Sequence, residues 1–266
     1  MYSTTYHRPS SVAEAASMFA KGTESKYLAG GHTLIPVMKQ RLASPSDVID
    51  LATIKDLIGI EASADTLTIK AATTHYDVAG SGPAQKAIPA LAYLASLIGD
   101  PAVRYRGTIG GSIANNDPAA DYPAAVLALG ATIKTNKRSI AADGFFKGLF
   151  ATALDDGEII TQIAFPIPAK AAYSKFPHPA SRFALTGVFV VKTKSGEVRV
   201  AATGASQDGV MRVPAIEAAL KANWSPGALD SVTISADGLM SDIHGSSDYR
   251  ANLIKVMAQR AVTAAG

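Results

Sequence analysis

The sequence of 266 residues contains no cysteine. Disulfides, thiolate metal sites, cysteine-bound iron–sulfur clusters and a cysteine nucleophile are therefore excluded within this chain. Its five histidines are scattered, at His7, His32, His75, His178 and His244, and no H-E-x-x-H motif occurs. We therefore expect no metal ion bound by this chain.

Long apolar runs and basic clusters are missing as well. No apolar stretch approaches the roughly 18–20 residues needed to cross a membrane, and the first eight residues lack the apolar segment of a signal peptide. We expect a soluble, cytoplasmic protein. The formal charge is +3, but only Lys137 and Arg138 are adjacent among 25 basic residues. Nucleic-acid binding needs clustered phosphate contacts, so it is disfavoured.

Apolar periodicity predicts both helices and strands along the chain, and the pattern of the last third suggests a small α+β domain. Before residue 58, the pattern predicts a β–α–β unit with a preceding helix, at residues 11–21, 27–29, 33–42 and 47–51. The middle of the chain gives strands at 67–71, 131–135 and 158–165 and helices at 88–98 and 118–129. After Pro166 and Pro168, a domain boundary is followed by a hairpin at 188–202, a loop at 203–209 and helices at 214–222 and 248–265.

The most informative feature is a pair of similar glycine turns. Gly30-Gly31 and Gly110-Gly111 each follow a short apolar or β-branched stretch and precede a polar residue and apolar, helix-like sequence. Glycine lets a ligand approach main-chain N–H groups, and a turn with several such groups binds anions. Two such turns are suited to the two phosphates of a dinucleotide, although ordinary tight turns are the alternative. Neither G-x-G-x-x-G nor G-x-x-x-x-G-K-[ST] occurs.

Polar residues surround the second glycine pair. Arg104 and Arg106 precede it and are available either to neutralise phosphate or to pair with nearby aspartates. Asn115, Asn116 and Asp117 follow it and favour turns. So many turn-forming residues between apolar helices favour a binding site over an ordinary loop.

At these residues the chain resembles the FAD-binding medium subunit of the molybdenum hydroxylases, the family of aerobic carbon monoxide dehydrogenase and xanthine dehydrogenase. The matching segments are residues 6–10, 29–36, 98–104, 106–123, 158–161 and 173–175. The most specific of these is residues 106–123, which read Arg-Gly-Thr-Ile-Gly-Gly-Ser-Ile-Ala-Asn-Asn-Asp-Pro-Ala-Ala-Asp-Tyr-Pro. The resemblance spans nearly the whole chain.

The resemblance implies a two-lobed FAD-binding domain of the vanillyl-alcohol-oxidase (PCMH) type at residues 1–168, with lobes at about 1–57 and 58–168. A small α+β C-terminal domain with an antiparallel sheet, of the carbon monoxide dehydrogenase flavoprotein type, would follow at residues 169–266. The FAD-binding residues that it implies are Tyr27, Leu28, Ala29, Gly30, Gly31, His32, Thr33, Leu34, Thr108, Ile109, Gly110, Gly111, Ser112, Asp121, Ile160 and Lys175. His32 is then a loop residue and not a covalent FAD attachment. Phe183 stands about where carbon monoxide dehydrogenase-like members place a tyrosine near the flavin.

The resemblance also implies the function and the partners. FAD would carry the redox chemistry, and this chain would supply binding and orientation without a catalytic residue of its own. Electrons would come from two iron–sulfur clusters on a small subunit and leave to an external acceptor. A large subunit with molybdopterin-bound molybdenum would oxidise the substrate, which would be carbon monoxide, an aldehyde or an N-heterocycle. The implied assembly is a heterotrimer, present as a dimer of heterotrimers.

Two other functions stay open at this point. The first is a self-contained FAD-dependent oxidoreductase of the same fold, which would need its own substrate base. No paired carboxylates and no histidine–acid motif are present to supply one. The second is a binding module for nucleotide or nucleic acid without enzymatic activity.

Overall fold

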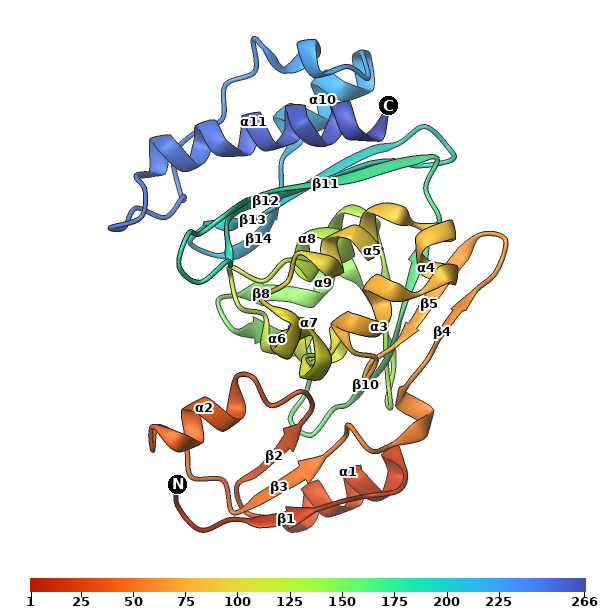
Figure 1. Ribbon diagram of the computed structural model, residues 1–266, viewed down its shortest axis with the longest axis vertical. Coiled ribbons are helices and arrows are strands. Elements are labelled where there is room, and N and C mark those ends of the chain that lie inside the picture. The colour runs from red at the N-terminus through yellow and green to blue at the C-terminus, as the bar shows by residue number, and fades with distance from the viewer.

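The computed structural model describes residues 1–266, which fold into three regions along the long axis of the molecule (Figure 1). The N-terminal region, residues 1–57, holds a three-stranded parallel sheet in the order β1-β3-β2. Its elements are β1 (Thr5–His7), α1 (Val12–Lys21), β2 (Ser25–Leu28), α2 (Leu34–Lys39), β3 (Asp47–Asp50) and the 3-10 helix η1 (Lys55–Leu57). Ser11 begins α1 because its hydroxyl accepts the amide of Glu14 at 3.1 Å. The β–α–β unit predicted from the sequence is confirmed.

The middle region, residues 58–168, surrounds an antiparallel sheet in the order β4-β5-β10-β6-β7. Its strands are β4 (Ile60–Ala62), β5 (Thr66–Lys70), β6 (Thr132–Thr135), β7 (Ser139–Ala141) and β10 (Ile160–Pro166), with the small pair β8 (Phe146–Gly148) and β9 (Ala151–Thr152). Its helices are α3 (His75–Gly80), α4 (Gly82–Ala87), α5 (Pro89–Ser96), α6 (Pro101–Arg106), α7 (Ile109–Asn115), α8 (Tyr122–Ala128) and α9 (Ala142–Phe145). Alternation in β5 buries Leu67 and Ile69 on the face that enters the main core.

The C-terminal region, residues 169–266, is a four-stranded antiparallel sheet with a long helix on its outer face (Figure 1). Its elements are β11 (Lys170–Pro177), β12 (Ala184–Lys192), β13 (Val198–Ser206), β14 (Gly209–Arg212), α10 (Pro214–Ala222), η2 (Pro226–Leu229) and α11 (Ser247–Ala265). Ile254 and Met257 of α11 pack on the outer face, whereas Phe189 and Val191 on the inner face join the core of the middle region. None of the helices is both long and apolar enough to span a membrane.

One predicted loop is a strand. The sequence predicted a loop at 203–209, but β13 continues through Ser206. The Thr203 hydroxyl donates to the carbonyl of Ala120 at 2.7 Å, and the Gly204 amide donates to the carbonyl of Pro118 at 2.8 Å. These contacts with a segment about 85 positions earlier hold the strand in place, and local sequence patterns cannot reveal them.

Candidate functional site

The first glycine turn, residues 27–34, has main-chain donors without acceptors. It follows β2, and Gly31 takes a φ of +77°, which favours glycine. The amides from Ala29 to Thr33 donate to no acceptor in the protein. Five successive unpaired N–H groups form a concentrated set of donors for an anion.

The second glycine turn, residues 108–112, lies directly beside the first. An ideal Cβ atom on Gly30 would overlap the carbonyl oxygen of Arg106 and lie 2.6 Å from the Cα atom of Gly107. A Cβ atom on Gly111 would lie 3.2 Å from the Cβ atom of Ala29. The missing side chains therefore allow the two turns to meet backbone to backbone.

The second turn differs from the anion-binding turn that the sequence suggested. Gly110 and Gly111 lie inside the first turn of α7 and not before it. The amide of Ile109 donates to the carbonyl of Thr73 at 3.1 Å, and that of Gly110 donates to the carbonyl of Ala71 at 2.8 Å. The amide of Gly111 donates to Oγ1 of Thr108 at 3.1 Å. Because these donors are already used, the second turn supplies a wall and the half-buried Ser112, and the first turn supplies the free amides.

A larger side chain at Gly110, as in Gly110→Val, would disturb packing and not a diphosphate directly. A Cβ atom at Gly110 would lie 2.6 Å from the Cβ atom of Ala71 and 2.7 Å from its carbonyl oxygen. The added side chain would therefore separate α7 from the end of β5. That substitution reports on packing of the middle region, and Gly30 is the sharper position for testing the turns.

Asp121 and Lys175, both implied by the resemblance, form a buried ion pair between the middle and C-terminal regions. Asp121 precedes α8 and Lys175 lies on β11, and their side chains are 4% and 3% exposed. The Lys175 ammonium donates to Asp121 at 3.0 Å and to the carbonyl of Leu97 at 3.2 Å, and the Tyr173 hydroxyl donates to Asp121 at 2.5 Å. Burial raises the pKa of Asp121, and Lys175 opposes that rise.

The resemblance also implied Tyr27, which bridges the N-terminal and middle regions, and Ile160, which lies in the core of the middle region. The Tyr27 hydroxyl donates to the carbonyl of Gly157 at 3.1 Å, and its ring stacks on Phe19 with 4.6 Å between centroids. Burial raises the pKa of Tyr27 to about 12, so its hydroxyl stays a donor at neutral pH. Ile160 is buried at the start of β10.

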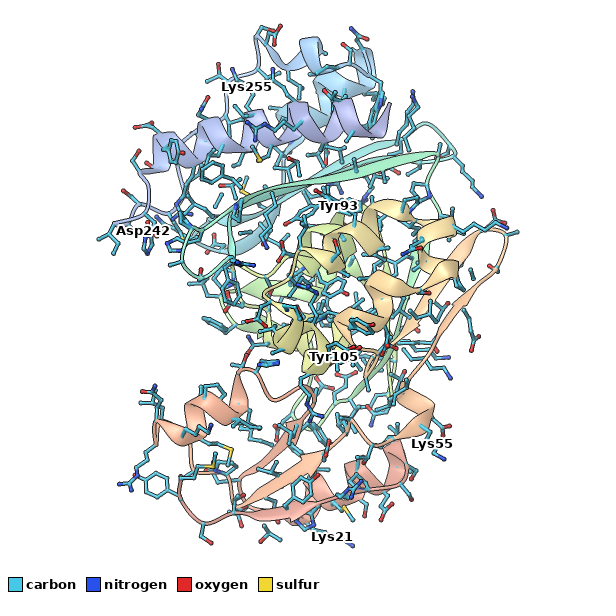
Figure 2. All side chains as sticks on the ribbon, viewed as in Figure 1. Lys21, Lys55, Tyr93, Tyr105, Asp242 and Lys255 are labelled. Atoms are coloured by element: carbon cyan, nitrogen blue, oxygen red, sulfur yellow. The ribbon has the colours of Figure 1, made fainter.

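Two other polar residues singled out in the sequence, Arg104 and Asn116, stabilise the fold through side-chain hydrogen bonds. Arg104 donates to the carbonyl of Ile98 at 2.9 Å. Asn116 ends α7 in a left-handed conformation, and its side-chain amide bonds the carbonyls of Gly148 and Ala151. The Arg106 side chain is exposed and makes no ion pair or hydrogen bond within the protein, and its carbonyl lies against Gly30 of the first turn. Tyr105, which directly precedes Arg106, lies near the junction of the N-terminal and middle regions (Figure 2).

His75 carries no functional signal in the sequence. The residue is 5% exposed, and Nδ1 of its ring has no hydrogen-bond partner. The Tyr122 hydroxyl, on a ring whose centroid is 5.4 Å away, is also buried without a partner. Burial lowers the pKa of His75 to about 3, helped by the charges of His32 and Arg104, so the ring is neutral. His32 is exposed on the first turn, and Phe183 is half exposed in the β11–β12 connection. No local pattern marks a buried histidine, so only the fold reveals it.

Comparisons with known proteins show the family to which the chain is similar. Residues 2–168 match the model of the family described as the FAD binding domain in molybdopterin dehydrogenase. The carbon monoxide dehydrogenase medium chain of Afipia carboxidovorans is 36% identical over 97% of this chain and 94% of its own length. The nicotine 6-hydroxylase medium subunit of Paenarthrobacter nicotinovorans is 34% identical over 98% of this chain and 96% of its own.

A solved structure extends the likeness to the fold. Quinoline 2-oxidoreductase from Pseudomonas putida 86 contains a chain that superposes with a TM-score of 0.87 at 28% identity, covering 99% of this chain and 96% of that one. The chain is therefore similar to these proteins in its fold as well as in its sequence. The chain belongs to the family of FAD-binding medium subunits of the molybdenum hydroxylases, which are oxidoreductases.

Proposed function

We propose that this chain holds FAD with its diphosphate on the free amides of the first glycine turn, as the electron-transfer subunit of a molybdenum hydroxylase. The observation that carries this proposal is the run of five unpaired amides from Ala29 to Thr33 beside the second turn. A diphosphate supplies the acceptors that these donors lack, and Arg106 adds an unpaired positive charge. The remaining contacts would come from the residues already named from the resemblance.

The protein's own part in this function is to bind, orient and exclude water. When bound, FAD supplies the redox chemistry that this chain lacks. The buried Asp121–Lys175 ion pair lies between the middle and C-terminal regions, which suits it to influence the electrostatics around the flavin. No acid–base residue is assigned here, because substrate oxidation belongs to another subunit in this proposal.

The proposed assembly follows from the relatives. They are medium chains or subunits of enzymes that oxidise carbon monoxide or nicotine. We extend to this chain a large subunit with molybdopterin-bound molybdenum and a small subunit with two iron–sulfur clusters, as a dimer of heterotrimers. The substrate remains open among carbon monoxide, an aldehyde and an N-heterocycle, and a cytoplasmic location stays a prediction from the sequence.

The test is a titration of the purified chain, stripped of bound flavin, with FAD and with riboflavin. We expect one FAD per chain and at least a 100-fold weaker affinity for riboflavin, because riboflavin has no diphosphate to satisfy the first turn. Equal affinities for the two flavins would contradict the assignment of the first turn. A chain that binds FAD and also oxidises a substrate alone would favour the self-contained oxidoreductase.

A further inference from the structure

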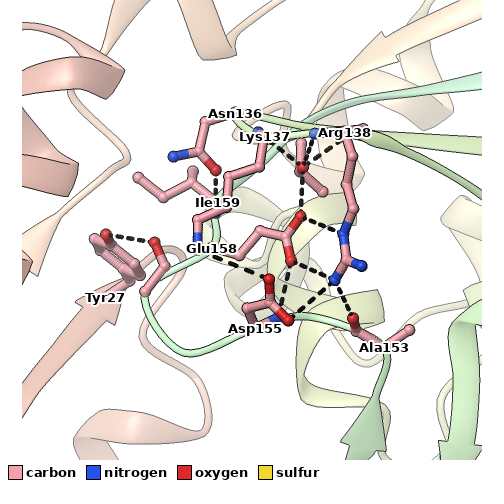
Figure 3. A network of polar contacts seen from close by, with 10 residues as sticks. Tyr27, Asn136, Lys137, Arg138, Ala153, Asp155, Glu158 and Ile159 are labelled. Carbon is pink, nitrogen blue, oxygen red and sulfur yellow. Dashed lines mark hydrogen bonds and ion pairs between the residues drawn. The ribbon is translucent and has the colours of Figure 1, made fainter.

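A buried carboxylate outside the FAD-binding residues anchors the segment next to them. One oxygen of Glu158 accepts the Thr135 hydroxyl at 2.6 Å and Nε of Arg138 at 3.1 Å. The other accepts Nη2 of Arg138 at 2.9 Å and the amide of Asp155 at 2.8 Å (Figure 3). The Glu158 side chain is fully buried, whereas that of Arg138 is 45% exposed. These bonds, above all those from Arg138, lower the pKa of Glu158 to about 2, so the carboxylate is charged at neutral pH.

The residue before Glu158 reaches the first glycine turn. Gly157 takes a φ of +68°, and its carbonyl accepts the hydroxyl of Tyr27, the residue that opens that turn. Figure 3 shows Tyr27 approaching this segment from the neighbouring region. A Cβ atom on Gly157 would lie 2.8 Å from the ring of Phe19, on which Tyr27 stacks. Gly157 therefore contacts both Tyr27 and the ring on which Tyr27 stacks.

The residues after Glu158 contact both the N-terminal region and the middle region. Ile159 is bonded in both directions to Asn136, at 2.9 Å each, and its side chain packs in the core of the N-terminal region with Ile49. The carbonyl of Thr161 accepts the amide of Ala71, whose own carbonyl holds the amide of Gly110. Residues 157–161 thus contact the supports of both glycine turns.

We propose that Glu158 is a positioning residue that sets the place of the first glycine turn through Gly157 and Tyr27, and thereby the affinity for FAD. This inference rests on the proposed function. Glu158 touches neither turn, so it acts only through the segment it anchors. A carboxylate that merely stabilised the middle region would affect FAD binding independently of Tyr27, and this difference makes the inference testable.

The experiment is a double-mutant cycle on FAD affinity with Glu158→Gln and Tyr27→Phe. We expect Glu158→Gln to weaken FAD binding roughly tenfold and to change the visible circular dichroism of the bound flavin. The double variant should bind FAD no more weakly than Glu158→Gln alone, because both changes release the same contact. Unchanged affinity in Glu158→Gln, or fold-changes that multiply in the double variant, would overturn the inference.

Glu217→Gln is the matched control, because Glu217 accepts Nε of Arg212 and the amide of Val200 in the C-terminal region. Glu217→Gln should leave FAD affinity unchanged. The double variant of Glu217→Gln and Tyr27→Phe should therefore bind FAD as Tyr27→Phe alone does. If Glu158→Gln does not fold, the same cycle is run with Arg138→Lys, whose half-exposed position tolerates replacement and which loses the two-pronged contact. Failure of the wild-type chain to bind FAD would refute the proposed function, whereas normal wild-type binding with no coupling refutes this inference alone.

Discussion

Gly30→Ala is expected to weaken FAD binding by roughly 100-fold, because the new methyl group would force the two glycine turns apart. The added Cβ atom would overlap the carbonyl of Arg106 and lie 2.6 Å from Gly107. Both contacts are with backbone, which cannot rotate away as a side chain can. Overpacking of this kind costs about 1–3 kcal/mol, and the upper end corresponds to roughly 100-fold in a dissociation constant. Fluorescence titration of the stripped chain with FAD measures the change.

The matched control is Gly80→Ala. A Cβ atom at Gly80 would meet nothing within 4 Å, so this variant should bind FAD with the wild-type affinity. Unfolding by urea without FAD separates a loss of binding from a loss of stability. Wild-type FAD affinity in Gly30→Ala would mean that the contact between the turns has no part in the site.

Lys175→Met is expected to lower the free energy of unfolding by about 3–5 kcal/mol at pH 7, because it leaves the buried Asp121 carboxylate without its cation. The loss should shrink as the pH falls towards the ordinary pKa of an aspartate, about 3.9. Burial already raises the pKa of folded Asp121, and the variant raises it further. The loss of stability therefore develops as the pH rises above the pKa that Asp121 has in the unfolded chain. It disappears at low pH, where Asp121 is protonated in both the folded and the unfolded chain.

Urea unfolding at several pH values measures this effect. Lys194→Met is the control, because the Lys194–Asp65 pair is exposed and such pairs contribute about 0–1 kcal/mol. Adding Asp121→Asn to Lys175→Met should recover part of the loss, since the unpaired charge is then gone. A deficit that is independent of pH would show that lost packing, and not the charge, explains the effect.

Local elements could be predicted because their signals are local. Ser11 caps α1, and alternation in β5 shows which side chains enter the core. The glycines of the second turn suggested an anion-binding turn, which was wrong for a physical reason. Gly110 is required by its close packing on Ala71, a residue far away in the sequence. A glycine that serves packing has the same local pattern as one that serves a turn.

The candidate site residues could be predicted from the family resemblance more than from local sequence patterns. Asp121 and Lys175 are 54 positions apart, and no periodicity predicts that they pair. His75 carried no signal at all, because burial of its ring depends on contacts with other helices. The free amides of the first turn could be suspected from Gly30-Gly31, but only the hydrogen bonds of the fold separate them from the occupied amides of the second.

The most direct test of the central claim is the amide spectrum of glycine-labelled chain, ¹⁵N in its 22 glycines, recorded during titration with FAD. The amides of Gly30 and Gly31 should shift strongly as FAD binds, because they gain the diphosphate as an acceptor. That of Gly110 should move little, because it keeps its bond to Ala71. Saturation with FAD while the signals of Gly30 and Gly31 stay unchanged would place the diphosphate elsewhere and contradict the account.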